Sequence, residues 1–380
     1  MNDTVQKRVL ILTANAGFGH RKAALAIAAA LREVYADLCT VEIANPLDDK
    51  RVPAFVRDSQ TDYDKLVRAM PELYRFGYET SDMAPISTVI EGAMVMILFN
   101  VLADLIRKYR PDVVVTTYPL YQSPLAAVYS LHRRRAPLIT VVTDLVTVHR
   151  VWFQRTSDLC IVPTEAVRQL ALDYRVPARK VKVVGIPVHP DFARQHGDKA
   201  TLRSQLGWRP DLTTVLVVAS KRVRNIRDVL RALNHTRLPL QLAVVAGGDE
   251  ALYHDLSAIT WHLETHLYRM VENMPLFMHA ADCVMSKAGG LIVSESLACG
   301  LPMLLVDVLP GQETGNADYV IGNGAGERIK DPLTALETLY HWLEHDGRLL
   351  AERARYAQRL GRPLAAYDIA DLVLEAATRA

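Results

Sequence analysis

The sequence predicts an α/β protein with two doubly wound domains that face a central cleft. Its 380 residues, half of them hydrophobic, exceed what one core usually fills. Short β-branched apolar runs alternate with helical patterns, which is typical of parallel sheets covered on both faces. A polar stretch flanked by prolines, Pro190–Pro210, separates two such series. We therefore expect Rossmann-like domains at residues 1–192 and 213–380, a linker at 193–212, and a last helix able to cross back to the first domain.

The strands are expected where runs of Val, Ile and Leu end in turn-forming residues. In the first domain these runs are Arg8–Thr13, Cys39–Asn45, Asp112–Thr117, Leu138–Thr143, Asp158–Pro163 and Val181–Val184. In the second domain they are Thr214–Ser220, Gln241–Ala246, Leu267–Val271, Cys283–Ser286, Met303–Val306 and Gly326–Ile329. Ligands of such sheets bind outside the carboxyl ends of the strands, so the loops at those ends are the candidate sites.

Composition excludes several classes of protein. Lys and Arg total 44 against 42 for Asp and Glu, so the net charge is near zero and the protein has no overall positive potential that would favour binding of nucleic acid. The cysteines show no Cys-x-x-Cys and no matching His spacing, which indicates neither a disulfide framework nor a zinc site; they are Cys39, Cys160, Cys283 and Cys299. The apolar run Val9–Leu12 is interpreted as a first strand rather than a secretory signal.

The most apolar window is Gly92–Ala103, whose length falls well short of the ~20 residues that a membrane-spanning helix needs. Because Arg107, Lys108 and Arg110 follow it, a helix lying at a membrane interface is one interpretation. A buried core helix that leads into the next strand is the other.

The segment Met285–Ala325 is the most informative about function. A strand end is followed by the turn Ala288–Gly290 and a helix start, where unpaired N–H groups and the helix dipole attract an anion such as a diphosphate. Glu295 comes about one turn into that helix, and the loop Pro310–Asn316 adds carboxylate and amide groups to the same rim. A Gly-Gly pair before a helix is common in α/β proteins, but the combination predicts a site for a phosphorylated, sugar-bearing ligand.

Two loops of the first domain carry candidate polar residues. The glycine-containing loop Asn15–Gly19 leads to His20 at a helix start, where a neutral imidazole is suited to accept a proton at neutral pH. A lone His at such a position is more often a surface or capping residue. Asp144 and His149 follow a predicted strand, with capping and loop packing as alternative roles, and the following Trp152 is more often a core residue than a ligand contact.

Several stretches resemble the monogalactosyldiacylglycerol synthases and the related diacylglycerol glucosyltransferases. They read SKAGGLIVSESLACGLP and PGQETGNADYVIGNGAG in the second domain, and ILTANAGFGHRKAALAIAAAL, VVTDLVTVHRVWF and VVGIPVHPDF in the first. The resemblance implies the GT-B fold and an inverting transfer of a hexose from a UDP-sugar to the 3-hydroxyl of 1,2-diacylglycerol. It favours galactose over glucose and implies a monoglycosyldiacylglycerol product.

The same resemblance implies roles for individual residues. It makes His20 the base that deprotonates the acceptor hydroxyl, with Asp144 orienting or polarising it. The residues implied at the acceptor are Gly17, Gly19, His149 and Trp152. The residues implied at the donor are Gly289 and Gly290 for the diphosphate, Glu295 for the ribose, Gln312 and Glu313 for the sugar, the backbone near Val271 for the uracil, and, without a finer role, Lys287 and Asn316.

The sequence departs from the family pattern in two places. The family usually has a glycine-rich loop after the first strand of the donor domain, where this chain has a basic run. Lys221, Arg222 and Arg224 are candidates to neutralise the diphosphate there, and a solvated basic helix start is the alternative. Tyr118 stands in a Tyr-Pro pair where the family generally has His-Pro.

The expected partners follow from this reading. The UDP-sugar is a substrate rather than a cofactor, and no metal is expected because no Asp-x-Asp lies at a strand end, so the helix dipole and cations would neutralise the diphosphate. Diacylglycerol would be met at a membrane surface, with anionic lipids as further candidates, and no nucleic acid. The expected location is cytoplasmic, peripherally attached to the inner face of the cell membrane. A UDP-sugar epimerase and a non-catalytic nucleotide or lipid sensor remain as alternatives.

Overall fold

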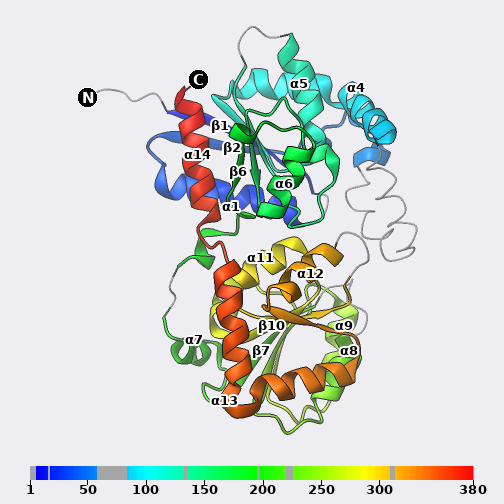
Figure 1. The fold of residues 1–380 in the computed structure, drawn as a ribbon, viewed down its shortest axis with the longest axis vertical. Coiled ribbons are helices and arrows are strands. Elements are labelled where there is room, and N and C mark those ends of the chain that lie inside the picture. Colours follow the sequence, from blue (N-terminus) through cyan, green and yellow to red (C-terminus); the bar gives the residue numbers. More distant parts are fainter. Residues whose placement is uncertain are drawn as a thin grey trace. The chain divides into compact units, whose positions relative to one another are not determined.

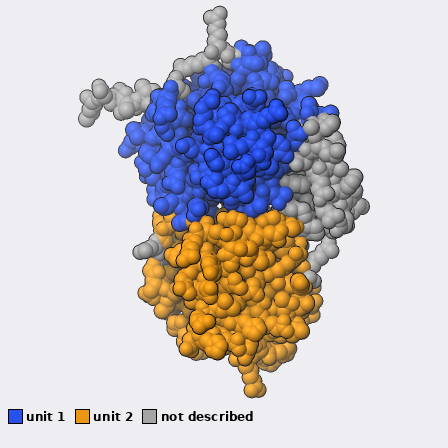
Figure 2. All heavy atoms as spheres, viewed as in Figure 1, with its two compact units in different colours: residues 1–190, 362–380 blue, residues 191–361 orange. Residues whose placement is uncertain are grey.

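The chain divides into two α/β units, each with its own parallel sheet (Figure 2). Unit 1 comprises residues 1–190 and 362–380, and unit 2 comprises residues 191–361. The computed structural model describes residues 6–15, 18–57, 84–131, 135–194, 197–219, 226–308 and 313–379. Residues 193–212, expected as a linker, fall within unit 2, and the last helix falls within unit 1.

In the described part of unit 1, six strands lie in the order β2-β1-β3-β4-β5-β6, and every neighbouring pair is parallel. The strands are β1 (Lys7–Leu12), β2 (Cys39–Ala44), β3 (Val113–Thr116), β4 (Leu138–Val141), β5 (Leu159–Val162) and β6 (Val181–Val183). The helices are α1 (Phe18–Val34), α4 (Ala84–Tyr109), α5 (Gln122–Ser130), α6 (Glu165–Asp173) and α14 (Ala365–Arg379). Short 3₁₀ turns lie at η1 (Pro46–Asp48), η2 (Pro119–Tyr121), η3 (Arg150–Trp152) and η4 (Ala178–Lys180), and a fifth, η5 (Pro190–Phe192), lies where the two units join.

The carboxyl-terminal helix α14 is part of the first core. Its apolar face, which includes Ile369 and Val373, packs in one cluster with α1 and with β1, β3 and β4. Figure 1 shows α14 beside α1. The alanines of α1, such as Ala24 and Ala28, are fully buried, and their small side chains let the helix lie close to both the sheet and α14.

In the described part of unit 2, six parallel strands lie in the order β12-β11-β10-β7-β8-β9. They are β7 (Thr213–Val218), β8 (Leu240–Val245), β9 (Thr265–Tyr268), β10 (Cys283–Ser286), β11 (Met303–Val306) and β12 (Gly326–Ile329). The helices are α7 (Lys199–Leu206), α8 (Ile226–Leu233), α9 (Glu250–Ser257), α10 (Met274–Ala280), α11 (Gly290–Ala298), α12 (Thr314–Gly322) and α13 (Pro332–Leu360). The core of this unit is a cluster of strand residues packed against α8 and the first half of α13, including Trp342.

The predicted strands agree with the observed ones to within two residues at most ends, because continuous Val, Ile and Leu runs are buried on both faces. The strand predicted at Leu267–Val271 is displaced. It begins at Thr265 and ends at Tyr268, since its neighbour β8 ends at Val245 and is followed by Gly247 and Gly248, both with positive φ. The prediction that Val271 lies at a strand end was therefore wrong.

The apolar window Gly92–Ala103 lies within the longer helix α4. Leu98 and Leu102 on its inner side are buried in the core cluster formed with β1 and β3, as the core-helix interpretation predicts. Its outer side is exposed, with Val89 at 72% and Met96 at 84%. No helix in the described ranges is long and apolar enough to cross a membrane.

Candidate functional site

The first candidate site lies at the carboxyl end of the sheet in unit 1, around His20. This residue stands in the first turn of α1, which begins shortly after β1 ends. Its Nδ1 lies 2.7 Å from the hydroxyl of Thr143, just beyond β4. Its backbone carbonyl accepts a hydrogen bond of 3.0 Å from the hydroxyl of Thr117, just beyond β3. Side chains from the ends of two neighbouring strands thus fix both the ring and the backbone of His20.

The ring of His20 is enclosed by aromatic side chains. Tyr118 meets it edge-on, with centroids 5.2 Å apart, and Trp152 lies tilted at 5.9 Å. Burial lowers the pKa of His20, and the negative charge of Asp144 opposes that shift without cancelling it. The imidazole is therefore neutral at pH 7. If Nδ1 carries the proton and donates it to Thr143, Nε2 keeps a lone pair and can act as a base.

Asp144 is held by Trp152, whose indole Nε1 donates a hydrogen bond of 2.7 Å to Asp144 Oδ2. Trp152 is only 1% exposed and belongs to a core cluster with Phe153 and Cys160. The side chain of Trp152 is covered by its own unit and supports Asp144, and its predicted acceptor-binding role stays a prediction. The indole positions the carboxylate of Asp144, whose negative charge opposes the lowering of the His20 pKa by burial.

His149 has the capping role that was the alternative in the sequence analysis. It is the N-cap of η3, where its Nδ1 accepts a hydrogen bond of 3.2 Å from the amide of Val151. Gly19 lies in the first turn of α1, where an added Cβ would meet nothing within 4 Å, so packing within the chain does not require glycine there. Gly17 lies outside the described residues.

Sequence reasoning missed the contributions of Thr117 and Thr143. The signal that could have found them is their position, since each is a hydroxyl residue at the carboxyl end of a buried apolar strand. Asp144 was found because it carries a charge. A threonine in a β-branched run is otherwise indistinguishable from a strand residue.

The second candidate site lies at the carboxyl end of the sheet in unit 2, where β10 leads into α11. Gly289 is the N-cap residue of α11 and supplies no side chain to pair with the first N–H groups of the helix. Those groups and the positive end of the helix dipole form an anion-binding position. Gly290 is the first helical residue. The diphosphate position at this turn stays a prediction.

A charged pair lies over this turn. Lys287 donates a short hydrogen bond to Glu313, which precedes α12. A Cβ added to Gly289 would lie 2.7 Å from Lys287 Nζ and 3.6 Å from Glu313 Oε1, so both charged groups lie directly above the turn. Asn316 completes the arrangement, because its Nδ2 donates a hydrogen bond of 2.9 Å to the carbonyl of Ala288.

The other residues predicted at the donor lie in different parts of unit 2. Glu295 is buried in the second turn of α11. Val271 lies in the loop between β9 and α10. Gln312 and the basic residues Lys221, Arg222 and Arg224 lie outside the described residues. The structure thus brings Lys287, Gly289, Gly290, Glu313 and Asn316 together in unit 2, and His20, Asp144 and Trp152 together in unit 1.

Within the ranges that the structure describes, no three His, Cys, Asp or Glu side chains converge as a metal site requires. Metal independence stays a prediction.

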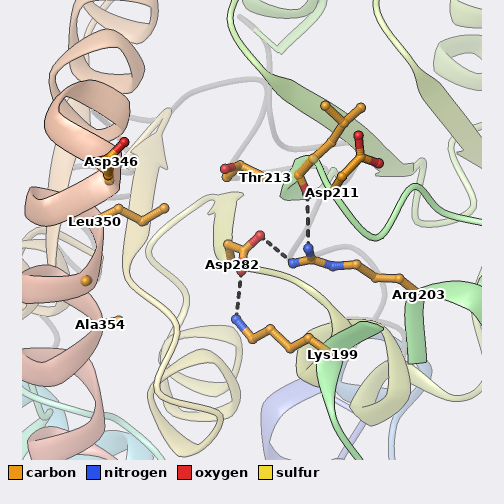
Figure 3. Close-up of a pocket in the computed structure, with 11 residues that line it drawn as sticks. Lys199, Arg203, Asp211, Thr213, Asp282, Asp346, Leu350 and Ala354 are labelled. Atoms are coloured by element: carbon orange, nitrogen blue, oxygen red, sulfur yellow. Dashed lines mark hydrogen bonds and ion pairs between the residues drawn. The ribbon is translucent and has the colours of Figure 1, made fainter. Parts of the chain in front are cut away.

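A separate pocket of about 400 Å³ lies at the opposite, amino-terminal edge of the second sheet (Figure 3). Figure 3 shows Lys199 and Arg203 directed at Asp282, which also accepts a hydrogen bond of 2.8 Å from the amide of Thr214. Arg203 is buried and donates to the carbonyls of Pro210 and Leu212 as well. These charges are matched within the protein and anchor α7 to the sheet.

Comparison with known proteins identifies the family. Residues 20–188 match the family model of monogalactosyldiacylglycerol (MGDG) synthase, and residues 218–362 match that of the glycosyltransferase family 28 C-terminal domain. The probable monogalactosyldiacylglycerol synthase 2 of Oryza sativa subsp. japonica is 31% identical over 374 residues, which cover 96% of this chain and 79% of that protein. The monogalactosyldiacylglycerol synthase of Spinacia oleracea is 32% identical over 373 residues, covering 96% and 71%. The chain belongs to the monogalactosyldiacylglycerol synthase family.

Solved structures agree with this family at the level of the fold. MurG of Acinetobacter baumannii has a TM-score of 0.63 at 17% identity and covers 97% of this chain and 99% of its own. The UDP-GlcNAc 2-epimerase of Neisseria meningitidis, bound to UDP-GlcNAc, has a TM-score of 0.61 at 14% identity and covers 97% and 100%. The predicted GT-B fold is confirmed, and family membership makes the chain a glycosyltransferase.

Proposed function

We propose that this protein transfers a hexose, with galactose preferred to glucose, from a UDP-sugar to the 3-hydroxyl of 1,2-diacylglycerol, inverting the anomeric centre. The observation that carries the proposal is His20, a neutral imidazole that contacts Thr143 and Trp152 and interacts electrostatically with Asp144. The family's members are named for galactolipid synthesis. A neutral base is what an acceptor hydroxyl requires, since the hydroxyl does not ionise by itself at neutral pH.

The chemistry assigned to the two sites is complementary. His20 Nε2 takes the proton of the acceptor hydroxyl as the oxygen forms a bond to C1 of the sugar. The bond between C1 and the diphosphate oxygen breaks, and its electron pair leaves with UDP. The N–H groups at the start of α11, together with Lys287, would stabilise the negative charge on the departing diphosphate. No step requires a metal ion.

The proposed acceptor, diacylglycerol, is a membrane lipid, and helix α4 offers a surface that could contact the membrane. Val89 and Met96 are exposed on the outer side of this helix, and its last turns carry Arg107 and Lys108. Apolar residues followed by cations are typical of helices that lie at a lipid interface. We therefore propose peripheral attachment to the inner face of the cell membrane, with anionic lipids assisting.

A donor panel tests the proposal. The protein is incubated with radiolabelled UDP-galactose or UDP-glucose and with vesicles that contain or lack diacylglycerol, with and without EDTA. We expect an EDTA-resistant monohexosyldiacylglycerol that forms faster from UDP-galactose and only with diacylglycerol. Epimerised UDP-sugar formed without vesicles would instead support an epimerase, and UDP binding without any turnover would support a sensor.

A further inference from the structure

The Lys287–Glu313 ion pair occupies the position where the proposed donor would place its diphosphate. We propose that this pair is a donor-operated switch: the incoming diphosphate takes Lys287 from Glu313, and the released carboxylate accepts hydrogen bonds from the sugar. This inference rests on the proposed function, because it assumes that a nucleotide diphosphate binds at the α11 turn.

The first argument is electrostatic. The amino-terminal end of a helix carries a partial positive charge, so a lysine ammonium placed over it is repelled. Lys287 Nζ lies in that position, 2.7 Å from where a Cβ on Gly289 would stand. Glu313 compensates both positive charges, and its side chain is only 4% exposed. The carboxylate of Glu313 therefore supplies the negative charge at this turn.

The second argument is an unpartnered polar atom at the same turn. Asn316, which is 4% exposed, donates its Nδ2 to Ala288, yet its Oδ1 has no hydrogen-bond partner among the described residues. A buried acceptor of this kind costs stability unless a ligand satisfies it. Asn316 and Glu313 belong to one helical turn, three residues apart. A ligand that supplies hydroxyl donors would satisfy Asn316 and the released Glu313 together.

The switch has a consequence for product release. An intact UDP-sugar offers a diphosphate to Lys287 and hydroxyls to Glu313, so both partners of the pair are paired again. UDP offers only the diphosphate, and the buried carboxylate is then left beside an anion. Glu313 therefore competes with UDP for Lys287, which favours the release of UDP after transfer.

Calorimetry with UDP and with uridine, on four variants and the wild type, tests the switch. Lys287→Met is expected to weaken UDP binding by about 10- to 100-fold, the loss of a charge-assisted contact, with less than a ~2-fold change for uridine. Glu313→Gln is expected to tighten UDP binding by about 3- to 10-fold, because a competing carboxylate is removed. In the Lys287→Met background, Glu313→Gln should tighten UDP binding less than it does in the wild type, since no lysine is left to release and only the repulsion between carboxylate and diphosphate is removed.

Glu327→Gln is the matched control, because Glu327 forms an ion pair with Arg353 in the same unit, away from the α11 turn. It should leave UDP affinity unchanged. Thermal unfolding of each variant checks folding, and Glu313→Ala replaces Glu313→Gln if the latter does not fold. Unchanged or weaker UDP binding in the Glu313 variant would overturn the switch while leaving the donor site in place. If the wild type binds no UDP, the proposed function and the switch both fail.

Discussion

Replacing Thr143 by Val should lower the rate of transfer without weakening donor binding. Val has nearly the shape of Thr, but it removes the hydroxyl that lies 2.7 Å from His20 Nδ1. Thr143 is buried, so no bulk water replaces the lost partner. If Nδ1 carries the proton and donates it to this hydroxyl, the hydrogen bond holds the tautomer in which Nε2 is free to act as a base. In that case its loss shifts the ring toward the inactive tautomer.

The size of the effect follows from the cost of leaving a buried donor unpaired. That cost is about 1–3 kcal/mol, which corresponds to a decrease of about 5- to 150-fold in the active population. Initial rates with UDP-galactose and diacylglycerol vesicles measure the decrease, and UDP calorimetry on the same preparation measures donor affinity. Thr143→Ser keeps the hydroxyl and should retain most of the activity. A Thr143→Val variant that is folded and works within about 2-fold of the wild type would refute the reasoning, since even a 1 kcal/mol cost exceeds that factor.

The remaining predictions concern pH, Asp144 and the donor turn. Burial lowers the pKa of His20 in the folded chain. In a pH–rate profile, kcat/KM should therefore stay constant near pH 7 and fall only as the pH drops below the ordinary histidine pKa of about 6.5. The same shift makes stability fall below about pH 6.5, because the unfolded chain then binds more protons, and thermal melts across pH would detect it. Asp144→Asn removes the charge that raises the pKa of His20, so the acidic limb should move to lower pH; a limb that moves upward would contradict this assignment. Glu295→Gln should weaken UDP binding by about 1–3 kcal/mol if it holds the ribose, measured by calorimetry against an unchanged melting temperature. Gly289→Ala should fold normally, because the φ of −68° at this position suits alanine. The variant should bind UDP less tightly, because the added methyl group displaces Lys287. Unchanged UDP affinity in calorimetry would count against this position for the diphosphate.

The strands were predictable from the sequence because buried parallel strands have a continuous apolar pattern. β10, β11 and β12 agree with the prediction at both ends. β9 does not, since its end is set by the neighbouring strand and by the glycine turn Gly247–Gly248, which lies 20 to 21 residues before Tyr268. The pattern of neighbouring residues does not indicate which strand β9 pairs with or where that pairing ends. The α11 turn was predictable, in contrast to the end of β9, because a glycine pair between a strand and a helix can be recognised from neighbouring residues alone.

The contacts within the sites were not predictable. His20 and Thr143 are 123 positions apart, and Lys287 and Glu313 are 26 apart, so only the folded sheet brings each pair together. Sequence reasoning assigned Lys287 and Glu313 separately to the donor and missed their mutual pairing. It assigned Trp152 to the acceptor, although an indole in an apolar segment is usually buried and uses its N–H internally. The charged residue Asp144 at a strand end was found more readily than the hydroxyl residues Thr117 and Thr143, which contact His20.

The central claim is that His20 is the base that activates the acceptor, and His20→Ala tests it most directly. UDP affinity and transfer to diacylglycerol are measured on one preparation of the variant. The account predicts UDP affinity close to that of the wild type and transfer lowered by about 10²- to 10⁴-fold, the usual contribution of a positioned general base. A folded variant that retains more than about a tenth of wild-type transfer would contradict the claim and make Asp144 the next candidate for the base.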